Sequence, residues 1–318
     1  MILAGIDIGT NTLRLLVAEI SPDSFFEVYS ARSITRLGQG LDRTGMISPE
    51  AGERSLEALL TFSKDILCHA ATHTTVIGTS ALRSASNSHS FIHRVKQRTG
   101  LDIQVISGEE EARLTLLGVT KALAVPRGTG KPYSLDLSLV IDIGGGSTEM
   151  IASCPGTAPV IKSLPLGAVY LTERFIHHDP PGRDEIEHLR HAVRNELDRH
   201  AEELQRFTGS TLVGTAGTIT TLAAIEQELA AYDPEMINGS LLTREWIERA
   251  VLKLGAQTVE ERRAIRGLEQ GREDIVFAGA VITQEIMYRF GYSSLLVSDW
   301  GLREGAVLDL HDRINKGL

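Results

Sequence analysis

Apolar positions along the 318-residue chain follow two alternating patterns. Short runs of β-branched and aliphatic residues predict buried strands, and longer segments with apolar residues every three to four positions predict helices. Strands are expected at 75–78, 103–106, 211–214 and 294–297. Helices are expected at 48–68, 90–99, 183–207, 243–254, 274–290 and 301–318, with others starting at Gly108 and Thr218. This alternation predicts an α/β protein with largely parallel sheets.

The apolar pattern also contains a duplication. Residues 5–12 (Gly-Ile-Asp-Ile-Gly-Thr-Asn-Thr) and 140–148 (Val-Ile-Asp-Ile-Gly-Gly-Gly-Ser-Thr) each predict a strand that ends in an aspartate and is followed by small residues. Backbone N–H groups and hydroxyls of such loops donate to phosphate oxygens, and an aspartate binds Mg²⁺ through its oxygens. Two such loops are expected to hold one phosphate chain from both sides, whereas either loop alone is equally typical of an ordinary tight turn.

Two prolines and two glycines within residues 125–132 predict a connector. A chain of this length is large enough for two domains. We therefore expect an N-terminal domain of residues 1–124 and a C-terminal domain of residues 125–298. The amphipathic last segment, from about residue 299 to residue 318, is expected to pack on the first domain and to make it discontinuous.

Composition limits the class of protein. Hydrophobic residues make up 42% of the chain and charged residues 23%, which is typical of a soluble globular protein. The chain has no apolar run of about 18 residues and no basic leader, so a cytoplasmic protein without a membrane span is expected. The formal net charge of −9 argues against nonspecific binding of nucleic acid. Cys68 and Cys154 lack the spacing of a zinc or redox site.

The second copy of the repeated phrase has the spacing of a hairpin. If glycines 145–146 form a two-residue turn, Asp142 lies opposite Glu149 on the same face. Two carboxylates about 5 Å apart repel each other, and a divalent cation relieves that repulsion. We expect Mg²⁺ there, with Mn²⁺ as the alternative; a solvated hairpin with acidic edges is the other interpretation. In the first copy Arg14 faces Asp7, so Asp7 is expected to orient a water or a metal-bound water.

A third glycine loop, residues 214–218 (Gly-Thr-Ala-Gly-Thr), follows an apolar strand and precedes a helix. The N–H groups and the positive dipole end of a helix start bind anions. On its own such a turn is more often an N-cap with close packing. Its interpretation as a phosphate site therefore depends on the other two loops.

The acidic run of residues 109–111 begins a predicted helix and contains candidates for a general base. Ser107 and Glu110 have the spacing of a capping box, which gives Glu110 a structural role. Glu111 has no such local role and precedes Ala112, the first residue of an apolar stripe. A carboxylate at the rim of an apolar face can act as a base toward water. An ordinary acidic first turn is the other interpretation, and these residues alone do not decide between the two.

Six motifs, in order along residues 5–305, resemble those of the exopolyphosphatase and guanosine pentaphosphate phosphohydrolase (Ppx/GppA) family. They are Ile6 to Arg14, Gly78 to Arg83, Ile106 to Ala112, Val140 to Glu149, Gly214 to Thr218 and Ser298 to Gly305. The resemblance implies the actin-like ATPase (ASKHA) fold, an α/β fold with two RNase H-like domains and a cleft between them. Without the additional domains of longer members, the chain resembles the short two-domain form.

The matched motifs also imply roles for individual residues. Glu111 matches the catalytic base, and Asp142 and Glu149 match acids that hold metal and position water. Arg83 matches an arginine that faces the cleft, where its planar group can hold a phosphate edge. The phosphate-binding positions are expected to be Gly9, Thr10, Asn11, Gly144, Gly145, Gly146, Ser147, Gly214, Gly217 and Thr218.

The resemblance implies hydrolytic release of terminal orthophosphate from inorganic polyphosphate. Guanosine pentaphosphate (pppGpp) hydrolysis, which needs the same chemistry, is the first alternative. A phosphotransferase of the sugar-kinase kind and a nucleotide-binding sensor without turnover are the others. Family members are often dimers, so a homodimer is the expected assembly.

Three features fall outside this pattern. Thr12 stands where many members have serine and keeps a hydroxyl, whereas Ala216 loses one that many members carry. The arginines within residues 262–272 are expected to form a solvated face, with guidance of an anionic polymer as the alternative. These arginines are Arg262, Arg263, Arg266 and Arg272.

Overall fold

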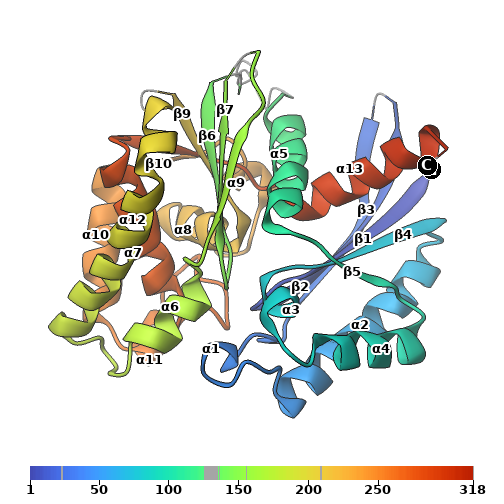
Figure 1. Ribbon diagram of the computed structural model, residues 1–318, viewed down its shortest axis with the longest axis horizontal. Coiled ribbons are helices and arrows are strands. Elements are labelled where there is room, and N and C mark those ends of the chain that lie inside the picture. Colours follow the sequence, from blue (N-terminus) through green and yellow to red (C-terminus); the bar gives the residue numbers. More distant parts are fainter. Residues whose placement is uncertain (23, 125–134, 136, 155, 208–209, 318) are drawn as a thin grey trace. The chain divides into compact units, whose positions relative to one another are not determined.

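A computed structural model of the chain describes residues 1–318 except 23, 125–134, 136, 155, 208–209 and 318 (Figure 1). The chain forms two compact units. Unit 1 comprises Met1–Gly118 and Gly301–Leu318, and unit 2 comprises Val119–Trp300. The segment 125–132, interpreted from the sequence as a connector, lies outside the described residues.

Unit 1 contains a five-stranded mixed sheet in the order β3-β2-β1-β4-β5. β1 pairs with β2 in antiparallel and with β4 in parallel orientation. The strands are β1 (Ile2–Ile8), β2 (Thr12–Ser21), β3 (Ser24–Ile34), β4 (His73–Gly78) and β5 (Ile103–Val105). The helices are α1 (Leu41–Thr44), α2 (Pro49–Cys68), α3 (Ser80–Ser84), α4 (Ser88–Thr99), α5 (Gly108–Ala124), which continues into unit 2, and α13 (Leu302–Asn315).

Helices cover both faces of the unit 1 sheet, which explains the nearly continuous apolar runs in β1 and β2. On one face, Ile6 belongs to the same buried cluster as Phe62 of α2. On the other face, Leu16 packs in a cluster with Val307 of α13. α2 begins where the sequence predicts because the Ser48 hydroxyl accepts from a first-turn N–H and a proline occupies the first helical position.

Unit 2 contains a six-stranded sheet in the order β10-β11-β9-β6-β7-β8. β6, β7 and β8 form an antiparallel meander, and β6, β9 and β11 run parallel. The strands are β6 (Ser138–Ile143), β7 (Thr148–Ser153), β8 (Val160–Leu164), β9 (Thr211–Thr215), β10 (Leu241–Thr243) and β11 (Ser294–Val297). The helices are α6 (Ala168–Phe175), α7 (Arg183–Leu204), α8 (Ala216–Glu226), α9 (Pro234–Ile237), α10 (Arg244–Ala256), α11 (Val259–Arg262) and α12 (Val276–Arg289), with a 3₁₀ turn η1 (Gln205–Phe207).

The centre of the unit 2 core is α12. Its residues 276–287 are all buried, and it contacts α6, α7, α8 and α10. A helix that is buried all round needs apolar side chains on every face rather than on one stripe. This explains why residues 275–282 form a continuous apolar run.

Most elements lie where the apolar pattern predicts them, with small shifts at their ends. The helix expected from residue 90 begins at Ser88, and the one expected from residue 274 begins at Val276. The pattern does not predict β3 and β8, because both are edge strands with largely exposed or half-buried residues. Among the described residues, none of the helices combines the length and hydropathy needed to cross a membrane.

Candidate active site

Both repeated phrases form the hairpins that the sequence predicts. In unit 1, Asp7 faces Arg14 across β1 and β2. In unit 2, Asp142 faces Glu149 across β6 and β7. The exposed fractions of these two acids are only 6% and 1%. The predicted pairing of two carboxylates on neighbouring strands is therefore confirmed, and both lie in a largely desolvated setting.

The loop between β1 and β2 is held through its carbonyl groups. The Thr10 carbonyl accepts from the Gly38 N–H at 2.9 Å, and the Asn11 carbonyl accepts from the N–H groups of residues 35–36 at 3.1 and 2.9 Å. A Cβ on Gly38 would lie 2.3 Å from Cγ2 of Thr10, so only glycine allows this approach. Thr10 and Asn11 are both buried. The segment after β3 thus fixes the conformation of the first candidate phosphate loop.

Glu111 is paired with Arg83 in unit 1. Arg83 on α3 donates from Nη1 to Oε2 of Glu111 at 2.6 Å and to the Ile106 carbonyl at 3.0 Å. Glu111 is 7% exposed in the first turn of α5, and the side chain of Arg83 is 23% exposed. The structure therefore brings together the two residues that the sequence assigns to base catalysis and phosphate binding, although they lie in different motifs.

The capping box predicted at the start of α5 is only half formed. The Ser107 hydroxyl accepts from the Glu110 N–H at 3.2 Å, as expected. The Glu110 carboxylate, however, accepts two hydrogen bonds from Arg113 at 2.7 and 2.8 Å. An arginine one turn away provides two charge-assisted hydrogen bonds, which compete with a single backbone N–H. Glu110 keeps a structural role, with a different partner.

The glycine loop after β6 is anchored on the N-terminus of α6. The first three N–H groups of α6, at residues 168–170, donate to the carbonyls of Gly144 and Gly145 at 2.9–3.0 Å. In a trans peptide unit the N–H points opposite to the C=O. The N–H groups of Gly145 and Gly146 therefore point away from α6. This orientation makes two backbone donors of the loop available to a ligand on the side that faces away from the helix.

The sequence pattern does not mark Gly167, the N-cap residue of α6, as a functional residue. A Cβ at this position would lie 2.2 Å from the Gly145 carbonyl oxygen and 2.3 Å from the Gly146 carbonyl carbon. Only glycine allows the helix start to approach the loop so closely. The signal in the sequence is weak, because a glycine before an apolar helix is also an ordinary N-cap.

The third loop begins α8. Ala216 has a positive φ of 66°, a conformation that costs a residue with a side chain about 1–2 kcal/mol. A Cβ on Gly217 would lie 2.3 Å from Nη2 of Arg272, so that guanidinium lies directly against the loop. Arg272 is 6% exposed and forms an ion pair with Glu269 at 2.6 Å. Thr218, in the first turn, is buried. A cation and a helix N-terminus thus meet at this loop.

The prediction of a solvated arginine face is wrong for two of its four residues. Arg262 and Arg272 are buried, whereas Arg263 and Arg266 are exposed. Arg262 donates to the Leu254 carbonyl from Nε at 2.9 Å and from Nη2 at 2.7 Å, and burial lowers its pKa. The local sequence predicts an exposed guanidinium at Arg262. In the folded chain, backbone carbonyls take the place of water as its hydrogen-bond acceptors.

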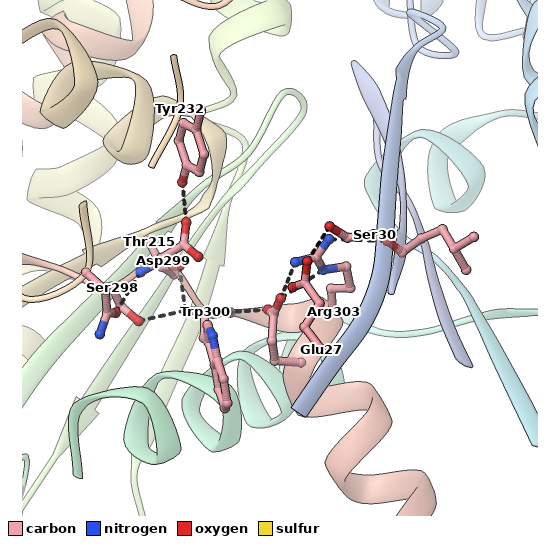
Figure 2. A network of polar contacts seen from close by, with 12 residues as sticks. Glu27, Ser30, Thr215, Tyr232, Ser298, Asp299, Trp300 and Arg303 are labelled. Atoms are coloured by element: carbon pink, nitrogen blue, oxygen red, sulfur yellow. Dashed lines mark hydrogen bonds and ion pairs between the residues drawn. The ribbon is translucent and has the colours of Figure 1, made fainter. Parts of the chain in front are cut away.

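The motif that follows β11 is tied to the third loop. The Trp300 carbonyl accepts from the Thr215 hydroxyl at 2.9 Å, and the Tyr232 hydroxyl donates to Asp299 (Figure 2). Thr215 also faces Asp142 across β9 and β6. Thr215, the neighbour of Asp142 on the sheet, is therefore held by Trp300, the last residue of unit 2.

The geometry of the acids limits how a metal can bind. Within the described parts of the chain, no group of three or more His, Cys, Asp or Glu side chains is placed to hold a metal ion. Asp142 and Glu149 provide two carboxylates on adjacent strands. Mg²⁺ commonly keeps several waters and takes one or two carboxylates together with substrate phosphates. The pair therefore fits Mg²⁺ that binds jointly with a phosphate ligand.

Comparison with known sequences finds similar proteins over nearly the whole chain. A profile of the Ppx/GppA phosphatase family matches residues 16–314. Exopolyphosphatase 2 of Mycobacterium tuberculosis is 33% identical over 322 aligned residues, which cover 96% of this chain and 98% of that protein. Exopolyphosphatase 1 of Mycobacterium bovis is 29% identical over 97% of this chain and 88% of its own length.

Solved structures show the same similarity. The Aquifex aeolicus member of the Ppx/GppA family is 33% identical, with a TM-score of 0.78 over 99% of both chains. An exopolyphosphatase from Cytophaga hutchinsonii is 30% identical, with a TM-score of 0.87 over 100% of this chain and 99% of the other. Each similarity extends over nearly the whole length of both partners.

Proposed function

The chain belongs to the Ppx/GppA phosphatase family, and we propose that it is an exopolyphosphatase, which releases terminal orthophosphate from inorganic polyphosphate. Its fold is the two-domain actin-like α/β fold. One observation carries the proposal: the Asp142–Glu149 pair stands beside a glycine loop whose carbonyls are held by α6 and whose N–H groups point away. Acids for a cation and donors for phosphate oxygens both stabilise the charge that develops in phosphoanhydride hydrolysis.

Phosphate binding is assigned to three loops. The N–H groups of the second loop donate to phosphate oxygens, and the third loop adds the N-terminus of α8. The Arg272 guanidinium, which is paired with Glu269, lies beside that helix start. The contributing positions are Gly9, Thr10, Asn11, Gly144, Gly145, Gly146, Ser147, Gly214, Gly217 and Thr218.

Glu111 is assigned the role of general base toward the attacking water, and Asp7 helps to orient that water. The Arg83 guanidinium at 2.6 Å favours the ionised carboxylate of Glu111, which is the form that accepts a proton. Arg83 has further N–H donors and can hold a phosphate edge while it stays beside Glu111. Base and phosphate are thereby positioned by one planar group.

Asp142 and Glu149 are assigned to Mg²⁺, with Mn²⁺ as the alternative. When bound there, the cation would offset charge on phosphate oxygens in the transition state. The chain's own part is to keep two carboxylates on neighbouring strands of a rigid sheet and to limit their access to water. Both conditions strengthen their attraction for a cation.

The proposal is tested by phosphate release in the presence of Mg²⁺. Short and long polyphosphate, guanosine pentaphosphate and ATP with sugar acceptors would be compared in parallel. Release that is fastest from polyphosphate supports the proposal. Preference for guanosine pentaphosphate would replace it with the nucleotide hydrolase, transfer to an acceptor would replace it with a kinase, and no turnover on any substrate would leave the sensor function.

Three finer assignments accompany this proposal. Each unit is proposed to be one RNase H-like domain, with the last helix completing the first. The protein is proposed to act in the cytoplasm as a homodimer, without nucleic-acid or membrane partners. Light scattering coupled to gel filtration tests the dimer, since a monomeric mass at micromolar concentration would exclude it.

A further inference from the structure

Four polar residues lie in one row across the unit 2 sheet. The register pairs Thr215 with Asp142, Asp142 with Glu149, and Glu149 with Ser163, from β9 through β6 and β7 to β8. Side chains of directly paired residues stand on the same face of a sheet. The two acids assigned to metal are therefore flanked on one face by a threonine and a serine.

Ser163, at the outer end of this row, is joined to Glu149 by a hydrogen bond. The Ser163 hydroxyl donates to Oε1 of Glu149 at 2.7 Å. Glu149 is 1% exposed, whereas Ser163 is exposed on the edge strand β8. A hydroxyl bond to an ionised carboxylate is stronger than one between neutral groups. An exposed serine thus donates to a buried carboxylate, although water is available to it as an alternative partner.

The neighbouring residues show that this contact is specific to one face. Lys162 precedes Ser163 on β8, its side chain leaves from the opposite face, and it pairs with Glu203 at 2.7 Å. The turn from β8 into α6 then leads to Gly167, which contacts the glycine loop. The segment 163–170 therefore holds both the acid and the loop of the second copy.

We propose that Ser163 is a positioning residue for metal binding. Its hydroxyl holds one oxygen of Glu149 and thereby fixes the orientation of the carboxylate that would bind the cation. This inference rests on the proposed function, since it takes Glu149 as a metal ligand. Groups that hydrogen-bond metal ligands commonly contribute 10–100-fold in metal affinity. Because water can partly replace an exposed hydroxyl, about tenfold is expected here.

The test is direct binding of Mn²⁺, measured by electron paramagnetic resonance on the full chain with inorganic phosphate at a fixed concentration. Ser163→Ala is expected to bind Mn²⁺ about tenfold more weakly than wild type. Ser163→Thr keeps the hydroxyl and is expected to restore binding. Ser153→Ala is the matched control, because Ser153 lies on the same face of β7, four residues from Glu149.

Turnover provides a second readout. At limiting Mg²⁺, Ser163→Ala is expected to be slower than wild type, and saturating Mg²⁺ should restore kcat without a change in KM for polyphosphate. A merely structural serine would instead lower turnover at every Mg²⁺ concentration. Wild-type Mn²⁺ affinity in Ser163→Ala, an equal loss in Ser153→Ala, or no rescue by threonine would overturn the inference.

Glu149→Gln separates this inference from the proposed function. If Glu149→Gln abolishes Mn²⁺ binding but Ser163→Ala binds normally, only the role of Ser163 is wrong. If Glu149→Gln leaves Mn²⁺ binding unchanged, the metal site itself is wrong and the role of Ser163 fails with it.

Discussion

The contact between Gly167 and the second glycine loop gives the sharpest prediction. In Gly167→Ala the new Cβ would stand 2.2 Å from the Gly145 carbonyl oxygen, a distance at which one of the two must move. The neighbour is backbone, and α6 is tied to the same loop by three hydrogen bonds. No flexible side chain is available to absorb the overlap. The loop or the helix start must therefore shift by about 1 Å to reach ordinary contact.

The magnitude follows from these contacts. Overpacking by one methyl group in a rigid site costs about 1–3 kcal/mol. Weakening one of the three N–H to carbonyl bonds adds about 1 kcal/mol. We expect a loss of about 3 kcal/mol in the free energy of unfolding of unit 2 (Val119–Trp300), which for a unit of this size corresponds to a thermal midpoint lower by about 6–12 °C. Because a displacement of about 1 Å at a reacting centre can cost about 100-fold in rate, kcat/KM should fall by about that factor.

The assay compares Gly167→Ala with Gly182→Ala. Gly182 is also a helix N-cap in extended conformation, but its nearest neighbour would be Oε2 of Glu185 at 3.6 Å, which is ordinary contact. The control should lose less than about 1 kcal/mol and keep full phosphate release. Thermal unfolding and turnover of both variants are measured side by side. Equal behaviour of the two variants would refute the argument that the helix start positions the loop.

Three further predictions follow from the same structure. Glu111→Gln should keep its thermal midpoint and Mg²⁺-dependent ligand binding but lose about 10²–10⁴ in kcat; near-wild-type turnover would exclude it as the base. Ala216→Gly should relieve the positive φ and raise the free energy of unfolding by about 1 kcal/mol, and the control Ala70→Gly (φ 54°) should gain as much. Only Ala216→Gly should alter phosphate release. An unchanged free energy of unfolding in urea would contradict the backbone strain. The Gly182 N–H, with His178 and the backbone N–H of His177, lowers the pKa of Glu185 from 4.5 to about 2. The stabilisation of the folded chain by ionised Glu185 should therefore be full above pH 4.5 and disappear as the pH falls toward 2. The difference in thermal midpoint between wild type and Glu185→Gln should vanish over the same range of pH. A difference that stays constant with pH would contradict this prediction.

Several features were determined by the sequence itself. The pairing of Asp142 with Glu149 follows from a two-residue turn and the twofold alternation of strands, both of which act over a few residues. The start of α2 at Pro49 follows in the same way from the local capping chemistry of Ser48. The motifs that resemble the Ppx/GppA family are likewise contiguous and can be recognised without coordinates.

Other features were decided only by tertiary structure. The pair of Arg83 and Glu111 joins residues 28 positions apart, and its geometry depends on where the fold places α3 and the first turn of α5. Arg262 and Arg272 lie in a stretch rich in charge, yet both are buried. Arg262 donates to the Leu254 carbonyl, and Arg272 lies against Gly217 at the start of α8. The role of Gly167 depends on a loop more than 20 residues earlier, so local pattern carries no trace of it. Capping, turns and alternation are encoded by neighbours in sequence, whereas burial and long-range hydrogen bonds depend on partners that only the folded chain brings together.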